Sequence, residues 1–162
     1  MLNNFTNYRT IEELKSEKFD WSFIPSTKGV YIVVYDNVNI PSFLPKGLGG
    51  FFKNIDPNVL IETLKQSWIK FSPGDDNIMY IGKAGGENTR STLKKRIKEY
   101  IRFGNGKSSP HRGGRYIWQI ANSDNLKIFW KESDDPIKEE KTMLLEFKAK
   151  HDNKLPFANL KM

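Results

Sequence analysis

The chain has 162 residues, of which 38% are hydrophobic and 13% aromatic, and it carries a formal net charge of +7 at pH 7. This length and composition predict one folded domain with a substantial core. The chain has no cysteine and two histidines, which excludes disulfides, thiolate catalysis, cysteine zinc sites and a zinc deaminase signature. The sequence shows no signal-peptide pattern, and no stretch approaches the roughly 20 apolar residues of a membrane span, so we expect a soluble, cytoplasmic protein.

The N-terminal half predicts a helical extension, one strand and an insertion. Residues 1–27 form the extension, with a short polar helix from about Thr10 to Lys18. A β-branched and aromatic run from Gly29 to Tyr35 predicts a buried strand. The insertion, at about residues 36–77, contains a helix opened by Asp56 and Pro57. The apolar stripe of this helix is Leu60, Leu64, Trp68 and Phe71.

A turn at residues 73–77 returns the chain to a second strand at 78–82, and a glycine-rich exit follows it. This exit lacks the spacing of a phosphate-binding loop, so we interpret it as a flexible turn. The next helix begins at an N-cap, Ser91, and runs to about Phe103. Leu93, Ile97 and Ile101 form its buried stripe, while Arg96 and Tyr100 share a neighbouring face that borders the core.

Positive charge is concentrated between Arg90 and Arg115, where nine basic residues accompany a single acid, Glu99. Such a local excess predicts contact with a nucleic-acid backbone, and a merely solvated helix face is the alternative. His111 lies in a glycine-rich loop, where a histidine is usually only solvated, and it is also a candidate for backbone contact. The candidate nucleic-acid-binding residues are Lys94, Lys95, Arg102, Lys107, His111, Arg112 and Arg115.

The C-terminal part predicts a short helix at residues 115–120 with a buried Trp118, a strand at 126–130, and a final helix from Asp135-Pro136 to about Lys150. An apolar stripe of Ile137, Met143, Leu144 and Phe147 marks the inward side of that helix. Glu140 falls on the same side. A buried carboxylate needs a partner, and a catalytic metal and a salt bridge to Arg or Lys are equally good explanations.

Several of these elements together resemble the GIY-YIG nuclease superfamily, from about residue 28 to the C-terminus. The shared features are the words GVY at 29–31 and YIG at 80–82, the lysine after the second word, Leu93-x-x-Arg96-x-x-x-Tyr100, an inward Glu140, and Asn159. Residues 111–120 also resemble segments of some bacterial members. The chain departs from the family pattern at Val30, which replaces isoleucine, and in the long stretch between the two words.

The resemblance implies an α+β fold in which a small three-stranded antiparallel sheet is flanked by helices, with the two words on adjacent strands. It implies that Tyr31 is the general base that activates water. Lys83 would assist by lowering the pKa of this phenol. Tyr80 would line the same site and orient phosphate or water.

The resemblance also assigns the remaining matched positions. Arg96 would bind the scissile phosphate, and Tyr100 would bond to phosphate or help in proton transfer. Glu140 would hold one Mg²⁺ or Mn²⁺, which stabilises the leaving oxygen. Asn159 would brace the site. Each of these residues, taken singly, also has an ordinary structural role; the two tyrosines, for example, are typical strand packing residues.

Three functions remain open from the sequence. The first is a metal-dependent endonuclease that hydrolyses DNA phosphodiester bonds, acting as a monomer or as a dimer. The second is a catalytically inactive nucleic-acid-binding module, although such a module has no need for an inward carboxylate. The third is a domain whose basic helix binds an acidic protein partner.

Overall fold

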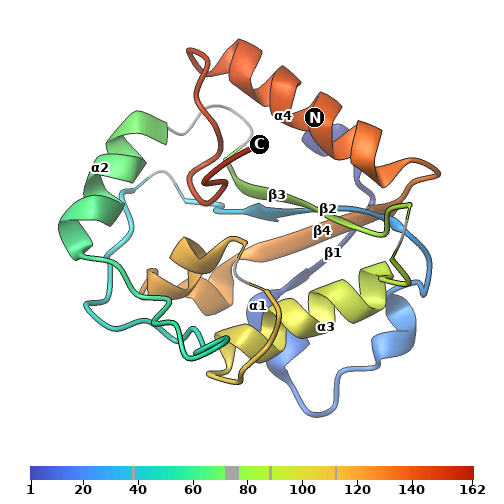
Figure 1. Ribbon diagram of the computed structural model, residues 1–162, viewed down its shortest axis with the longest axis horizontal. Helices are drawn as coiled ribbons and strands as arrows, with labels where there is room; N and C mark the ends of the chain where they lie inside the picture. The colour runs from blue at the N-terminus through green and yellow to red at the C-terminus, as the bar shows by residue number, and fades with distance from the viewer. Residues whose placement is uncertain (38, 72–76, 88, 112) are drawn as a thin grey trace.

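A four-stranded antiparallel sheet lies at the centre of the protein (Figure 1). The computed structural model describes residues 1–37, 39–71, 77–87, 89–111 and 113–162, with the backbone alone at 69–71. The strands follow the spatial order β1-β4-β2-β3, so β3 lies at an edge of the sheet. Their bounds are β1 (Asn7–Thr10), β2 (Gly29–Val34), β3 (Ile78–Ala84) and β4 (Lys127–Glu132).

Strands β2 and β3 carry the two tyrosine words and pair directly, as expected. All six residues of β2 are buried, which suits its continuous run of apolar and aromatic residues. Tyr31 lies opposite Gly82, and Val33 lies opposite Tyr80. The Tyr35 N–H donates to the Asn77 carbonyl at 3.0 Å and closes the base of this hairpin. The insertion therefore leaves the sheet at the end of β2 and returns to it at the start of β3, and the two words pair undisturbed.

The sheet has one strand more than the three that the resemblance implies, and this corrects the expectation for the first 27 residues. Strand β1 pairs with β4 over four residues, from Asn7 opposite Trp130 to Thr10 opposite Lys127. The sequence of β1 shows no apolar alternation because it forms the outer edge of the sheet and is half exposed. The helix predicted from Thr10 is shorter, α1 (Ile11–Lys15), and Thr10 caps it by accepting from the Glu13 N–H.

Helices cover both faces of the sheet (Figure 1). Helix α4 (Pro136–Lys150) packs on β3 and β2 from one side, and α3 (Leu93–Gly104) packs on the same strands from the other side, next to α1. The bounds of α4 agree with the prediction, and the Asp135 side chain caps it by accepting from the Lys138 N–H. Thr92, rather than the predicted Ser91, caps α3. The predicted apolar stripe of α3 is buried.

Two predicted apolar stripes are correct only in part. In α2 (Ile61–Phe71), Leu64 and Trp68 are buried, but Leu60 precedes the helix and is 77% exposed. The side chain of Phe71, like most of the predicted turn at 73–77, lies outside the described residues. In α4, Ile137 is 42% exposed because it lies in the first turn, while the other three stripe residues are buried.

Short 3-10 helices complete the fold: η1 (Leu2–Asn4), η2 (Trp21–Phe23), η3 (Arg115–Gln119) and η4 (Ser123–Asn125). Segment η3 confirms the short helix predicted there, and its Trp118 is fully buried as expected. The final predicted strand is observed as β4. Within the described part of the chain, no helix combines the length and apolar character needed to span a membrane.

Candidate functional site

A cavity of about 250 Å³ opens at the edge strand β3. Five of the seven predicted catalytic residues line it, although they come from β2, β3, α3 and α4 and are far apart in the sequence. They are Tyr31, Tyr80, Lys83, Arg96 and Glu140. Folding has therefore gathered a cation, a carboxylate, two phenols and a guanidinium around one space large enough for a phosphate group and several waters.

The ring of Tyr31 lies across Gly82 of the neighbouring strand. A Cβ atom at position 82 would be 2.6 Å from Tyr31 Cζ and 2.7 Å from its hydroxyl oxygen, which is too close for any real contact. Glycine is therefore required at position 82, because the ring of Tyr31 occupies the space that a side chain there would fill. Tyr80 lies on the same face of the sheet, with its ring centroid 6.0 Å from that of Tyr31.

His111 is fully buried against Tyr31, which corrects the expectation that it is solvated or contacts a substrate backbone. Its Nε2 lies 2.8 Å from the Tyr31 hydroxyl oxygen, and its Nδ1 lies 2.9 Å from the Gly113 carbonyl oxygen. A sequence signal for this arrangement exists in the two glycines that follow. A Cβ at Gly113 would lie 2.5 Å from the Tyr80 hydroxyl, and Gly114 has a φ of 70°. Both glycines indicate a loop pressed onto the site.

Burial is the main cause of the pKa shifts of the three tyrosines and of His111. It raises the pKa of the Tyr31 hydroxyl well above its usual 10, with a further increase from Tyr80, while the Arg96 cation opposes the change. Burial likewise raises the pKa of Tyr80, and that of Tyr100 well above 10. For His111, burial and then the Arg96 cation lower the pKa to about 3. The tyrosines are therefore phenols and the imidazole is neutral near pH 7.

The carboxylate of Glu140 has a cationic partner, as expected from its inward position. Its Oε2 forms an ion pair with Lys83 Nζ, and the two side chains are 19% and 36% exposed. Lys83 lies opposite Val30, so its side chain leaves the sheet on the α4 side, whereas Tyr31 points to the α3 side. The cation that opposes the rise in the pKa of Tyr31 is Arg96 rather than Lys83. The assistance that the resemblance assigns to Lys83 has no counterpart in this geometry.

Arg96 borders the cavity with a partly exposed guanidinium. Its Nη1 contacts the Glu99 carboxylate at 3.2 Å and donates to the Pro110 carbonyl at 3.1 Å. A guanidinium has five N–H donors, so these two contacts through one nitrogen leave the group able to bind a phosphate.

Tyr100 and Asn159 do not line this cavity, although Asn159 lines a neighbouring hollow together with Tyr80, Lys83 and Glu140. The Tyr100 hydroxyl donates to the Gly114 carbonyl at 3.4 Å, and its ring stacks on Tyr80. The Asn159 side chain accepts from the Ile81 N–H and donates to the Ile81 carbonyl, both at 2.8 Å. Asn159 thus occupies the open edge of β3, as a brace would, while the hydroxyl of Tyr100 is directed to a backbone carbonyl.

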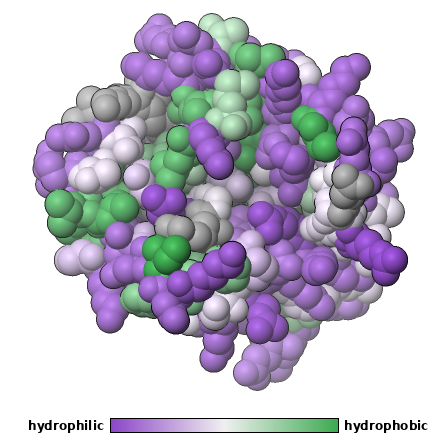
Figure 2. Space-filling view, in the orientation of Figure 1, coloured by the Kyte–Doolittle hydropathy of each residue, from purple (hydrophilic) through white to green (hydrophobic). Residues whose placement is uncertain are grey.

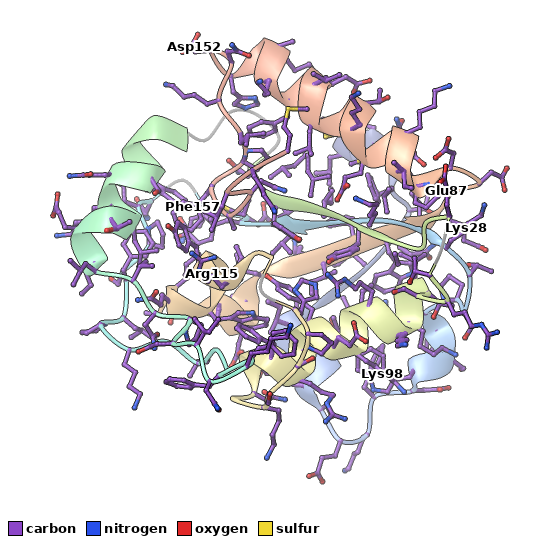
Figure 3. The ribbon with its side chains drawn as sticks, viewed as in Figure 1. Lys28, Glu87, Lys98, Arg115, Asp152 and Phe157 are labelled. Atoms are coloured by element: carbon purple, nitrogen blue, oxygen red, sulfur yellow. The ribbon has the colours of Figure 1, made fainter. Side chains whose placement is uncertain are left out.

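The basic residues of α3 form a second feature of the surface. Lys94, Lys95 and Arg102 line a hollow of about 460 Å³ together with the loop at 108–110. Lys98 lies on the side of α3 turned away from the sheet (Figure 3), and hydrophilic residues dominate the surface there (Figure 2).

The remaining basic candidates are distributed around the molecule. Lys107 is exposed. Arg115 lines a hollow of about 470 Å³ that shares Tyr80, Lys83 and Glu140 with the main cavity. Arg112 lies outside the described residues. Cationic side chains therefore flank the cavity on two sides, one along α3 and the other beside η3.

One carboxylate of the cavity could hold a hydrated divalent ion. No group of three or more His, Cys, Asp or Glu side chains gathers as a metal site in the part of the chain that the structure describes. Mg²⁺, however, is commonly held by one or two carboxylates, with waters and phosphate oxygens as its other ligands. Glu140 supplies one carboxylate. Ser91 also lines the cavity, and its hydroxyl oxygen is buried without a hydrogen-bond partner among the described residues.

Comparisons with protein-family models, with curated proteins and with solved structures find no match. The function of the cavity must therefore be inferred from its own residues. These residues are a guanidinium, a carboxylate paired with an ammonium, and a phenol hydrogen-bonded to a buried imidazole.

Proposed function

We propose that this protein is a metal-dependent endonuclease of the GIY-YIG type that hydrolyses DNA phosphodiester bonds. One observation carries the proposal. Tyr31, Tyr80, Lys83, Arg96 and Glu140 line a single cavity, although they come from four different elements. Titratable side chains that converge from four elements on one space are typical of a binding or catalytic site, so binding and chemistry explain this arrangement better than packing does.

In this mechanism Arg96 binds the scissile phosphate and neutralises the charge that develops on its oxygens. Tyr31 takes a proton from the attacking water, and Tyr80 orients the water or the phosphate from the adjacent strand. The guanidinium fork of Arg96 suits this role because it can bind two phosphate oxygens at once.

Glu140 would hold Mg²⁺ or Mn²⁺, and Ser91, which lines the same cavity, would bind an associated water. When bound, the ion stabilises the negative charge on the leaving oxygen. Lys83 pairs with the same carboxylate in the protein alone, so it keeps the buried charge of Glu140 compensated before the metal binds.

DNA is the proposed substrate because the excess positive charge lies beside the cavity. Lys94, Lys95 and Arg102 would contact phosphates along α3, and Arg115 would contact phosphates on the other side. Each neutralised phosphate releases a counterion, so binding should weaken steeply with salt.

The test is cleavage of duplex, flap, branched and single-stranded DNA with Mg²⁺ or Mn²⁺. Wild type should cut at least one of these substrates and stop in EDTA. Arg96→Ala and Glu140→Gln should each lower the rate by about 100-fold or more. Glu139→Gln is the matched control, because Glu139 is the preceding residue on α4 but pairs with Lys131 instead. It should cut at nearly the wild-type rate.

The same experiment separates the alternatives. Salt-sensitive DNA binding without metal-dependent cleavage of any of the four substrates would favour the inactive binding module. Absence of DNA binding at low salt would favour a protein partner for α3 and refute both nucleic-acid functions.

A further inference from the structure

We propose that His111 is the positioning residue that fixes the Tyr31 hydroxyl and receives its proton while Tyr31 takes one from the attacking water. The inference rests on the proposed function and deepens it. The family resemblance assigns the role of assisting Tyr31 to Lys83, but the ammonium of Lys83 is paired with Glu140. The proposal assigns this role to His111 instead.

The hydrogen bonds of His111 define the position of its proton. A carbonyl oxygen only accepts, so the contact of Nδ1 with the Gly113 carbonyl at 2.9 Å requires the proton on Nδ1. A neutral imidazole then has a bare Nε2, which accepts from the Tyr31 O–H at 2.8 Å. The loop thus selects the tautomer whose free lone pair faces the phenol.

Tyr31 needs such a partner because it cannot ionise easily by itself. The phenol is completely buried, and its nearest polar neighbours include two other buried phenols, Tyr80 and Tyr100. A free phenolate in this place would be poorly solvated, and the pKa of Tyr31 is raised accordingly. A base that removes the phenolic proton at the same time as the water proton arrives avoids this intermediate.

The charged and titratable groups around His111 also favour proton uptake only when substrate is present. Tyr31 and Tyr80 face it from the sheet, Tyr100 faces it from α3, and Arg96 acts on it electrostatically. The Arg96 cation disfavours an imidazolium. A phosphodiester bound to Arg96 would bring a compensating negative charge and make the imidazolium easier to form.

The step balances without any further reactant. The water oxygen bonds to phosphorus while the bond from phosphorus to the leaving oxygen breaks, and the leaving oxygen takes a proton from solvent. One water proton passes to Tyr31 Oη, and the phenolic proton passes to His111 Nε2. After the product leaves, the proton on His111 returns through Tyr31 to solvent.

His111→Gln tests the proposal, because a glutamine oxygen can still accept from Tyr31 but cannot take up its proton. We expect kcat to fall by about 100-fold or more with little change in KM. Tyr31 would then have to ionise alone, so the rate of the variant should rise about tenfold per pH unit between pH 7 and 9, while the wild-type rate stays nearly flat. A merely structural role would not change this slope. His151→Gln, which alters the other histidine, is the control and should behave as wild type.

A second measurement does not depend on a variant. Nitrogen-15 NMR of the histidines in wild type should show His111 neutral and protonated at Nδ1 between pH 5 and 8. Protonation at Nε2 would overturn the proposal, as would a His111→Gln variant that cuts with the wild-type rate and pH profile. In the latter case the endonuclease function would stand. Absence of cleavage by wild type would instead overturn the function and the proton transfer together.

Discussion

Acid should destabilise this protein chiefly through His111. In the folded chain burial and Arg96 lower its pKa from 6.5 to about 3, so between these values the unfolded chain binds a proton that the folded chain does not. A group with a depressed pKa contributes stability that is present above pH 6.5 and lost as the pH falls towards 3. Between pH 8 and pH 5 this difference amounts to about 2 kcal/mol, at 1.36 kcal/mol per unit of pKa.

The assay is urea denaturation of wild type and His111→Gln at pH 5, 6, 7 and 8. Wild type should lose about 2 kcal/mol more than the variant over this range, because all other titrating groups are common to both proteins. His151→Gln, in which His111 is intact, should keep the wild-type slope. Equal slopes for wild type and His111→Gln would refute the buried, neutral imidazole on which the reasoning depends.

Three further substitutions each test one contact around the site. Gly82→Ala should destabilise the fold by about 1 to 3 kcal/mol in urea denaturation, because the new Cβ would lie 2.7 Å from the Tyr31 hydroxyl. Asn159→Ala should cost about 1 kcal/mol or more in the same assay, because the N–H and C=O of Ile81 lose their partner. Lys83→Met should raise the affinity for Mn²⁺ about two- to fivefold in calorimetric titration, because the carboxylate on α4 no longer has to exchange an ammonium for the metal.

Each of these substitutions has a matched control. Gly86→Ala should be milder than Gly82→Ala, because its Cβ would meet side-chain carbons of Thr89 at 3.3 Å and of Ile137 at 3.4 Å and no backbone atom among its nearest neighbours. Asn7→Ala, the control for Asn159→Ala, removes an exposed contact with the Thr6 hydroxyl and should lose little stability. Lys131→Met breaks the pair with Glu139 and should not change the affinity for Mn²⁺. If a variant behaved as its control does, the expected contribution of the contact that it removes would be wrong.

Local patterns in the sequence predicted the elements that form the cavity. The strand at Gly29, the buried stripe of α3 and the limits of α4 follow from composition and from three- and four-residue spacing, which depend on neighbours in the chain. The inward position of Glu140 followed from the same periodicity, and so did its need for a partner. Which partner it has could not be predicted, because Lys83 approaches from a different element.

Features that depend on distant partners escaped prediction. Strand β1 has no apolar pattern of its own, and it exists because Asn7 to Thr10 can pair with β4, more than a hundred residues later. The burial of His111 has a similar cause. Its neighbours Gly, Ser and Pro are typical of a solvated loop, yet the loop folds back onto Tyr31. Local composition correctly predicts a loop, but it carries no information about the tertiary contacts that bury the loop.

The insertion between the two tyrosine words helps to explain how this loop is held. Gln119, at the end of η3, is buried; its side chain accepts from the Val59 N–H at 2.9 Å and donates to the Val59 carbonyl at 2.9 Å. At the other end of the loop, the Gly50 N–H donates to the Phe103 carbonyl of α3 at 2.8 Å. The insertion therefore contacts the chain on both sides of the segment that carries His111. A long connection in this place disturbs the β2–β3 hairpin little, because the base of the hairpin is closed, and its contacts hold the loop that places His111 against Tyr31.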